Sequence, residues 1–236
     1  MYSEAAAFYD LIHDARDRDP FAEAEVVINE VRLRNPQART LLDVACGTGA
    51  NLRRFSESFE VVGLDASAEM LAIAREKYPH LPLVTADMRN FELGRRFDAI
   101  VSIFSGIGYL LEPADLRRAI ATMAGHLTSG GVLMLEGWVE PDRWMGSTVS
   151  VDAVETPGLA LARVTRSTRD GLRTEWTSRY VAATNAGLET IDEHHVMRLS
   201  DPEEFASAYR QAGLRFERLS DLLRPGRSVY VGVEAS

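Results

Sequence analysis
The chain has 236 residues, of which 46% are hydrophobic and 26% charged, so it is long enough for one sizeable core or for a core with an elaboration. Its formal net charge of −9 argues against nonspecific binding to nucleic acid or to acidic membranes. A single cysteine, Cys46, excludes an intramolecular disulfide and a metal cluster built from cysteines.

The first 19 residues combine aromatic side chains with a run of alternating charges. They lack the basic-then-apolar layout of a signal peptide, and no apolar run reaches the roughly 18 residues of a membrane span, so we expect a cytoplasmic protein. The leader is either a frayed end or a lid over a ligand pocket, and its aromatic content favours a lid formed by residues 1–19. Pro20 then begins a helix that Asn35-Pro36 stops.

The central motif of the sequence is an apolar run that ends in Asp43 and continues through small residues and two glycines to residue 51. This pattern is typical of a buried parallel strand that turns over a ligand into the next helix. Gly47 and Gly49 lack a Cβ, so the backbone there can approach a ligand closely. A dinucleotide fingerprint would place Gly or Ala where this chain has Leu52, so the motif predicts a nucleoside-like ligand without a pyrophosphate. The alternative is an ordinary strand–helix turn in another α/β protein.

A second apolar run, 60–65, also ends in an acid. Asp65 lies about 20 residues after Asp43, a spacing at which a carboxylate can accept hydrogen bonds from both ribose hydroxyls. Otherwise it is a solvent-exposed acid at the end of a strand. Ser67 is a suitable N-cap for the next helix, and residues 83–86 predict a short third strand.

Residues 99–104 are apolar almost throughout, which predicts a fourth strand buried on both faces and followed by a flexible loop at 105–109. An amphipathic helix over 113–127 leads through the turn at 129–131 into a fifth strand at 132–136. Alternating strands and helices imply a parallel sheet with right-handed crossovers. Ligands then bind beyond the carboxyl ends of its strands.

After Glu136 the pattern changes from helical to β-type periodicity. Turns at Asp170-Gly171 and Asn185-Ala-Gly187 help to define an antiparallel meander, whose strands are expected at 148–154, 159–169, 172–183 and 188–199. Ser200 and Glu203 form an expected capping box for a last helix, which ends at Gly213. A closing antiparallel pair follows, at 214–219 and 228–233.

The heptad Asp43-Val-Ala-Cys-Gly-Thr-Gly49 matches in full the first motif of the class I S-adenosylmethionine-dependent methyltransferases, which the chain resembles. The resemblance implies that S-adenosyl-L-methionine binds here and leaves as S-adenosyl-L-homocysteine. Asp87 would face the adenine amino group, which is a hydrogen-bond donor, and Met88 would line the adenine ring. The residues implied to bind the cofactor are Tyr9, Arg16, Asp43, Ala45, Gly47, Gly49, Asp65, Ala66, Met70, Asp87, Met88 and Phe104.

We therefore expect an α/β fold of the Rossmann-like type. It is a three-layer sandwich around a mostly parallel seven-stranded sheet with an antiparallel last strand, plus a small antiparallel β meander. Residues 1–138 and 200–236 form the predicted methyltransferase core. Residues 139–199 form the insert, which contributes to the acceptor pocket or to a dimer contact.

Methyl transfer from a sulfonium is an in-line displacement, in which holding the acceptor close and aligned is the enzyme's largest contribution. No metal is required, and the chain has no GxxxxGK, HExxH or GxSxG motif. The adjacent His194 and His195 would point to opposite faces of a strand, so no metal site is expected there. An amine acceptor must lose its proton before attack, and the candidate side chains near the pocket are Tyr2, Tyr9, His13, Tyr109 and the histidines of the meander.

Nearly end to end, the chain is similar to the bacterial N,N-dimethyltransferases that act on nucleotide-linked amino deoxysugars. The similar segments are 2–10, 41–49, 87–91, 104–108, 136–138, 163–164 and 225–227. In that family an N-terminal Tyr and a His after an Ile-Gly pair border the amine, and an Arg in the last hairpin meets the nucleotide diphosphate.

Tyr2 and Arg227 match two of these three positions. A guanidinium pairs bidentately with phosphate, and the alternative for Arg227 is a solvated turn residue. The family's His is Tyr109 in this chain, a poorer base at neutral pH, and Val139 stands where the family commonly has a second Trp. The resemblance implies catalytic roles for Tyr2 and Tyr109, and substrate-binding roles for Ser105, Trp138, Arg163 and Arg227.

The sequence thus predicts a methyltransferase that N-methylates an amino group of a small molecule, with a nucleotide-activated amino sugar as acceptor, no nucleic-acid or membrane partner, and a homodimer as one arrangement. Two alternatives stay open. One is a methyltransferase of an unrelated small amine or hydroxyl metabolite, and the other is a non-catalytic S-adenosylmethionine-binding module. A nucleic-acid methyltransferase is disfavoured by the acidic charge and by the lack of an Asn/Asp-Pro-Pro-Tyr motif.

Overall fold

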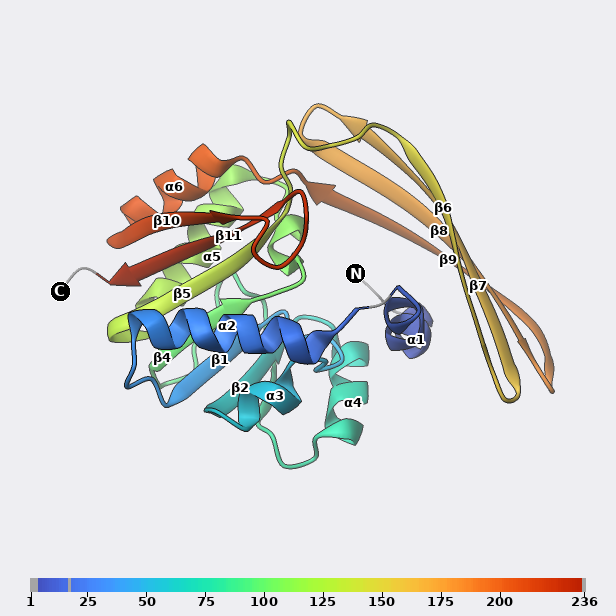
Figure 1. Ribbon diagram of the computed structural model, residues 1–236, viewed down its shortest axis with the longest axis horizontal. Helices are drawn as coiled ribbons and strands as arrows, with labels where there is room; N and C mark the ends of the chain where they lie inside the picture. Colours follow the sequence, from blue (N-terminus) through green and yellow to red (C-terminus); the bar gives the residue numbers. More distant parts are fainter. Residues whose placement is uncertain (1–3, 17, 235–236) are drawn as a thin grey trace.

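The computed structural model describes residues 4–16 and 18–234, which contain two separate β-sheets (Figure 1). The larger sheet has seven strands, and β11 is antiparallel to the other six. In order across the sheet they are β10 (Leu214–Ser220), β11 (Arg227–Glu234), β5 (Leu127–Val139), β4 (Phe97–Ser102), β1 (Thr40–Val44), β2 (Glu60–Asp65) and β3 (Leu83–Thr85). The mostly parallel sheet with an antiparallel last strand is confirmed.

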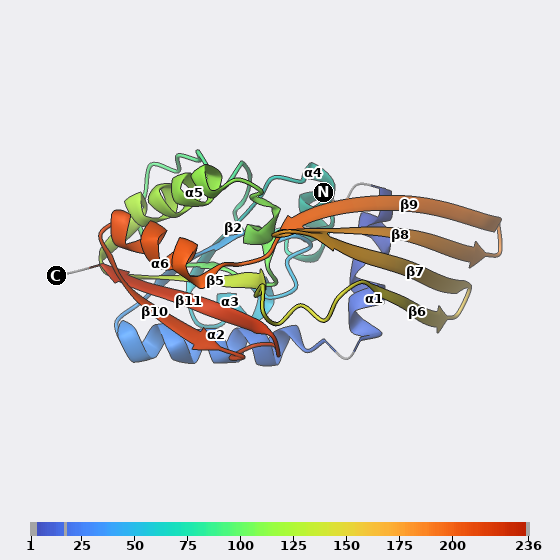
Figure 2. The ribbon, with the colours of Figure 1, turned by 90° about the horizontal axis from the view of Figure 1, so that it is seen from above.

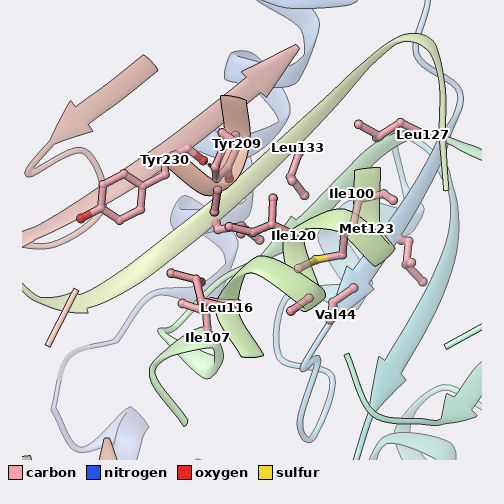
Figure 3. Packing of buried hydrophobic residues seen from close by; sticks show 14 of the residues in the cluster. Val44, Ile100, Ile107, Leu116, Ile120, Met123, Leu127, Leu133, Tyr209 and Tyr230 are labelled. Atoms are coloured by element: carbon pink, nitrogen blue, oxygen red, sulfur yellow. Dashed lines mark hydrogen bonds between the residues drawn. The ribbon is translucent and has the colours of Figure 1, made fainter. Parts of the chain in front are cut away.

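Helices cover both faces of this sheet because successive side chains of a strand point to opposite sides. Leu41 of β1 packs into the apolar cluster under α2 (Pro20–Arg34) and α3 (Leu52–Ser56). Leu42 packs into the opposite cluster, under α5 (Pro113–Gly125) and α6 (Pro202–Gln211), where Figure 3 shows Ile120, Met123 and Tyr209 against the strands. Helix α4 (Ala68–Lys77) contacts β2 and β3. The result is the three-layer sandwich that was predicted.

The smaller sheet is an antiparallel meander that projects from one end of the sandwich (Figure 2). Its strands are β6 (Thr148–Thr156), β7 (Leu159–Asp170), β8 (Arg173–Thr184) and β9 (Gly187–Arg198). The two hairpin turns lie at residues 171–172 and 185–186, within one residue of the positions that the sequence predicts.

The N-terminal segment lies between the two sheets (Figures 1 and 2). It consists of the short 3-10 helix η1 (Glu4–Phe8) and α1 (Tyr9–Asp14). Ala5 and Ile12 are fully buried against Leu161, Tyr180 and Ile191 of the meander. The segment is therefore packed on the meander by apolar burial.

The start of β5 corrects a prediction. The strand begins at Leu127 instead of residue 132, and the preceding helix α5 ends at Gly125. The residues expected to form a turn lie inside the strand, where its register with β4 shifts between the Phe97–Leu127 pair and the Ala99–Val132 pair. Gly130 has φ +73°, which is the left-handed conformation that a bulge residue adopts.

The predicted capping box of the last helix is wrong. Asp201 is the N-cap of α6, and its side chain accepts a hydrogen bond from the backbone N–H of Glu203 at 2.9 Å. Pro202 fits the first helical position, which places the cap one residue after Ser200. The Ser200 hydroxyl instead accepts a hydrogen bond from the backbone N–H of Trp138 at 2.8 Å.

Candidate active site
A cavity of about 1220 Å³ lies where the strands of the larger sheet reach their carboxyl ends. Its walls come from the loops after β1, β2, β3, β4 and β5, from α1, from β7 and β8, and from the turn between β10 and β11. This is the location expected for a ligand of an open α/β sheet. The volume exceeds that of most single-ligand pockets, so two ligands can lie side by side.

The backbone is most unusual at the rim of this cavity. Ala45 after β1 and Phe104 and Ser105 after β4 have φ values of 59°, 66° and 65°, a region that side-chain-bearing residues rarely adopt. For this reason β1 ends at Val44, and β4 ends at Ser102, two residues before the predicted end of the fourth strand. Such strain clusters at functional sites.

The two rim loops also touch each other. A Cβ at position 106 would lie 2.6 Å from the Cβ of Ala45, so only glycine fits there. At Gly47, which has φ +56°, a Cβ would meet nothing within 4 Å, so this backbone faces open space. The loop after β1 is therefore fixed on one side by Gly106 and left open on the other for a ligand.

The three predicted carboxylates, Asp43, Asp65 and Asp87, line this one cavity. Asp65 accepts backbone hydrogen bonds from Gly47 at 2.7 Å and from Ser67 at 2.8 Å, which fix the orientation of the carboxylate. Burial, followed by the nearby Asp65, raises the pKa of Asp43 to about 8.

Asp87 has a different environment. Arg89 donates to both oxygens of the carboxylate, from Nε at 3.0 Å to each and from Nη2 to Oδ2 at 2.5 Å. Hydrogen bonds from Arg89 hold the pKa of Asp87 below its usual value. The lone pairs of the Asp87 carboxylate are thus partly occupied by hydrogen bonds from Arg89, which the sequence did not predict.

Most of the other predicted site residues also line the cavity. They are Tyr9, Arg16, Ala45, Gly47, Ala66, Met70, Met88, Phe104, Tyr109, Trp138, Arg163 and Arg227. Gly49 lies outside the lining, with its turn packed against Leu52 and Tyr78. Ser105 is fully buried behind the lining, where its hydroxyl donates to the Gly137 carbonyl at 2.6 Å and accepts from Arg227 Nη1 at 3.0 Å. Tyr2 lies outside the described residues.

The N-terminal segment is tied to the central motif by polar contacts. The Thr48 hydroxyl donates to Asp10 at 2.7 Å, and Lys77 of α4 pairs with the same carboxylate. Tyr9 and His13 pack together with ring centroids 4.4 Å apart. Burial raises the pKa of Tyr9 to about 12, and burial, aided by Arg163, lowers the pKa of His13 to about 3. Both side chains are therefore neutral at pH 7.

Four polar atoms in the lining are buried and have no hydrogen-bond partner in the described parts of the chain. Arg224 Nη2 forms an ion pair with Glu23, and the other three are His13 Nε2, Asn51 Oδ1 and Trp144 Nε1. Buried polar groups are ordinarily paired, because an unpaired one costs about 1–3 kcal/mol. His13 Nε2, Asn51 Oδ1 and Trp144 Nε1 therefore have free hydrogen-bonding capacity for a polar ligand. These three atoms, the carboxylates and the open space at Gly47 fit a cofactor with ribose and amino groups. The rim residues with a left-handed backbone conformation complete this site.

The side of the cavity near β11 is rich in arginine despite the acidic net charge. The guanidinium carbons of Arg18, Arg224 and Arg227 lie 3.9, 4.5 and 5.9 Å from the centroid of the Phe104 ring. Glu136 of β5 is fully buried and binds Arg224 at 2.6 Å through both oxygens. Burial lowers the pKa of Arg227 to about 10, so it stays charged at neutral pH.

Sequence reasoning missed Arg18 and Arg224. The available signal was Glu136, because a carboxylate in a buried strand requires a cationic partner. Only the fold identifies which arginines supply it.

Arg16 and Arg163 are joined through one carboxylate. Arg16 donates to the two oxygens of Asp152 at 2.6 and 2.8 Å, and Arg163 donates to Asp152 Oδ2 at 2.7 and 3.0 Å. This network links the end of the N-terminal segment to β6 and β7. The roles predicted for Arg16 and Arg163 in ligand binding stay predictions, since their contacts here are with Asp152.

Tyr109 lines the cavity from the 3-10 helix η2 (Gly106–Tyr109), and its hydroxyl lies 2.9 Å from Nδ1 of His195. Burial raises the pKa of the Tyr109 phenol, so it stays protonated at neutral pH. His195 is 2% exposed, whereas the side chain of His194 is 56% exposed. The two histidines therefore face opposite sides of β9, as predicted.

In the described parts of the chain, no three His, Cys, Asp or Glu side chains come together as a metal site. None of the helices in residues 4–16 and 18–234 is both long and apolar enough to cross a membrane.

Comparison with known proteins gives consistent matches. A methyltransferase-domain family model matches residues 41–131. The chain is 40% identical to dTDP-3-amino-3,4,6-trideoxy-alpha-D-glucopyranose N,N-dimethyltransferase of Streptomyces venezuelae, with 100% of each chain covered. It is 39% identical to the crystal structure of DesVI from Streptomyces venezuelae, with TM-score 0.93 and 100% of both chains covered. CalS10 from Micromonospora echinaspora, an amino pentose methyltransferase with S-adenosylmethionine bound, is 35% identical with TM-score 0.88, over 100% of this chain and 98% of that one.

Proposed function
Because the chain belongs to the family of dTDP-amino-sugar N,N-dimethyltransferases, we propose that this S-adenosylmethionine-dependent methyltransferase N-methylates the amino group of a deoxysugar linked to a nucleoside diphosphate. The observation that carries this proposal is one continuous cavity with a carboxylate-lined end and an arginine-lined end. A cofactor with hydroxyl and amino groups suits the first end, and a diphosphate suits the second.

At the carboxylate end, Asp65 would accept the ribose hydroxyls, and Asp87 and Met88 would hold the adenine. The other cofactor contacts that we propose are Tyr9, Arg16, Asp43, Ala45, Gly47, Gly49, Ala66, Met70 and Phe104. When bound, S-adenosylmethionine supplies an electrophilic methyl group on a sulfonium. The left-handed backbone at Ala45 and Phe104 keeps both rim loops fixed before any ligand arrives, which favours a defined orientation.

At the arginine end, Arg227 would bind the diphosphate. Its guanidinium lies 4.4 Å from the Trp138 ring and is held by the Ser105 hydroxyl, so the fork is oriented in advance. Ser105 thus acts through Arg227. Arg163 would add positive charge from the meander, although Asp152 neutralises part of it.

Tyr109 would receive the amine between these two ends. A neutral phenol both donates and accepts hydrogen bonds, so it can orient an amine whose lone pair points to the methyl donor. Tyr2 remains a proposed second contact to the amine.

The experiment that tests the function is turnover with a panel of nucleotide-linked amino sugars, followed by mass spectrometry of the acceptor and assay of S-adenosylhomocysteine. We expect replacement of one or two amine hydrogens by methyl groups. If no amino sugar is methylated but an unrelated amine or hydroxyl metabolite is, the substrate assignment is wrong and the general methyltransferase alternative holds.

We also propose that the chain forms a homodimer through the outer surface of the meander, and that it is cytoplasmic. The support is a group of exposed apolar side chains on this sheet: Val149, Val151, Val164, Val181 and Leu188. Sedimentation analysis should give a dimer that Val151→Lys weakens. A monomer in the unaltered protein would contradict this assembly, and cell fractionation tests the location.

A further inference from the structure
Behind Tyr109 a line of polar side chains leads away from the cavity. The Tyr109 hydroxyl lies 2.9 Å from His195 Nδ1, and His195 Nε2 lies 3.3 Å from Oε2 of Glu193. His195 and Glu193 are two residues apart on β9 and so face the same side of the strand. They are 2% and 7% exposed, and neither belongs to the cavity lining, whereas Tyr109 does.

The chemistry of the three groups gives this line a direction. An ionised carboxylate only accepts hydrogen bonds, so Glu193 favours the tautomer of His195 in which Nε2 carries the proton. Nδ1 then presents a lone pair and accepts the hydrogen bond of the Tyr109 hydroxyl. This leaves the phenolic oxygen of Tyr109 free to accept a hydrogen bond from a donor in the cavity.

Resting on the proposed amine acceptor, we propose that Tyr109, His195 and Glu193 form a proton relay that deprotonates the acceptor ammonium before methyl transfer. One ammonium N–H bond breaks as an O–H bond forms on Tyr109, while the hydroxyl proton of Tyr109 moves to His195 Nδ1. The amine gains its lone pair, and Glu193 stabilises the imidazolium. The proton passes to water before the next turnover, so one proton is released for each methyl group transferred.

The groups around the relay are consistent with this path. Trp176 of β8 stacks on the His195 ring with centroids 5.0 Å apart and covers one face of it. Burial is the main cause that raises the pKa of Tyr109. A phenol in this setting passes a proton on without existing as a free phenolate, so it suits a relay better than a lone base.

Two more groups influence the far end of the line. Tyr180 of β8 lies near Glu193, whose charge adds to burial in raising the pKa of Tyr180. Arg163 of β7 approaches the Tyr180 ring, with Cζ 5.8 Å from its centroid. Arg163 and Glu193 thus act on Tyr180 in opposite directions, since Arg163 lowers the pKa of Tyr180 and Glu193 raises it.

The relay makes His195 and Glu193 positioning residues, and it is tested by the pH dependence of kcat/KM. His195→Asn keeps a hydrogen-bond acceptor for Tyr109 but cannot take up a proton. The enzyme then requires an acceptor that is already neutral. We expect a loss of about 10²-fold near pH 7, and an acidic limb shifted by roughly one pH unit or more towards the pKa of the free amine, with the rate recovering at alkaline pH. Tyr109→Phe should shift the limb in the same direction.

Glu193→Gln should move the acidic limb the opposite way, to lower pH, because the imidazolium loses its counter-charge. NMR titration of the His195 ring gives a readout independent of turnover, and its pKa should fall in this variant. His194→Asn is the matched control, since His194 is exposed on the other face and 3.6 Å from Glu175; its profile should equal that of the unaltered protein.

Variants of His195 and Glu193 that lower kcat equally at all pH values would overturn the relay and leave these residues a structural role. An unchanged His195 pKa in Glu193→Gln would also overturn it. These results differ from failure of the proposed function, in which the unaltered enzyme methylates no nucleotide-linked amine at any pH.

Discussion
At the scale of single residues, aspartates that line the same cavity lie in different environments and therefore have different pKa values. Asp43 is 2% exposed and lies near Asp65, so burial and like charge raise its pKa to about 8. Asp87 is held by Arg89, so its pKa is lowered. An aspartate side chain thus favours its protonated form at position 43 and its charged form at position 87.

Asp43 gives a prediction about stability. In the unfolded chain its pKa is near 3.8, so between about pH 4 and 8 the folded state holds a proton that the unfolded state has released. The free energy of unfolding should therefore fall as the pH rises through this window and level off above it. Asp43→Asn should remove this dependence and raise Tm at pH 8 by about 2–4 °C or more.

Thermal unfolding of the ligand-free protein from pH 4 to 9 checks this prediction. Asp87→Asn is the control, because the pKa of Asp87 is shifted down and its contribution is present at high pH and lost as the pH falls below its usual range. A Tm difference between Asp43→Asn and the unaltered protein that is constant with pH would contradict the argument.

Arg227 gives a prediction about substrate binding. Arg227→Lys keeps the charge but loses the planar fork that pairs with phosphate. We expect about a tenfold rise in KM for a nucleotide-linked amino sugar with little change in kcat, as for an interaction made equally in ground and transition states. Arg215→Lys, on the exposed side of the same hairpin, should change neither constant. A fall in kcat with constant KM would place Arg227 in the chemical step instead.

At the scale of elements, the N-terminal segment joins the two sheets. Apolar burial of Ala5 and Ile12 fastens it to the meander, and Asp10 fastens it to Thr48 of the central motif. The network of Arg16, Asp152 and Arg163 adds a second attachment. One short segment therefore contacts both walls of the cavity, and its order affects both ligand sites.

Asp152→Asn tests this attachment, because it leaves the guanidinium of Arg163, a residue that is 5% exposed, without its carboxylate. We expect a loss of stability on the order of 3 kcal/mol and faster amide hydrogen exchange in residues 9–14. Asp192→Asn, whose exposed partner is Arg179, should cost less than about 0.5 kcal/mol. Unchanged exchange in residues 9–14 would show that apolar packing alone holds the segment.

At the scale of the whole molecule, residues of both sheets and of the N-terminal segment line the cavity. The N-terminal segment lies between the two sheets (Figure 2). A ligand that contacts all three parts should order them together. S-adenosylhomocysteine at 100-fold excess over its Kd should raise the free energy of unfolding by about 2.7 kcal/mol, which corresponds to about 5–10 °C in Tm. Hydrogen exchange should slow in residues 9–14 as well as after β1 and β2. Slowing confined to the larger sheet would show that the N-terminal segment does not take part in cofactor binding.

The sequence by itself determined the alternation of strands and helices, the change to an antiparallel meander after Glu136, and the position of the acids at strand ends. These features follow from the periodicity of apolar residues and from the positions of the glycines. Both are local patterns that involve residues close together in the chain. It did not determine the bulge in β5, because Gly130 is equally suited to a turn and to a strand irregularity. The capping residue of α6 was missed for a similar reason, since Ser200 and Asp201 are both good caps and packing decides between them.

Only the tertiary structure decided which charges meet. Glu136 and Arg224 are far apart in the chain, as are Tyr109 and His195, and no local pattern pairs them. Their partners are selected when the closing hairpin and β9 are brought against the loops after β4 and β5, where burial makes an unpaired charge or hydroxyl costly. The cofactor end follows a local motif, so it can be predicted from the sequence. The acceptor end is assembled from segments that are distant in the chain, so only the tertiary structure identifies its residues.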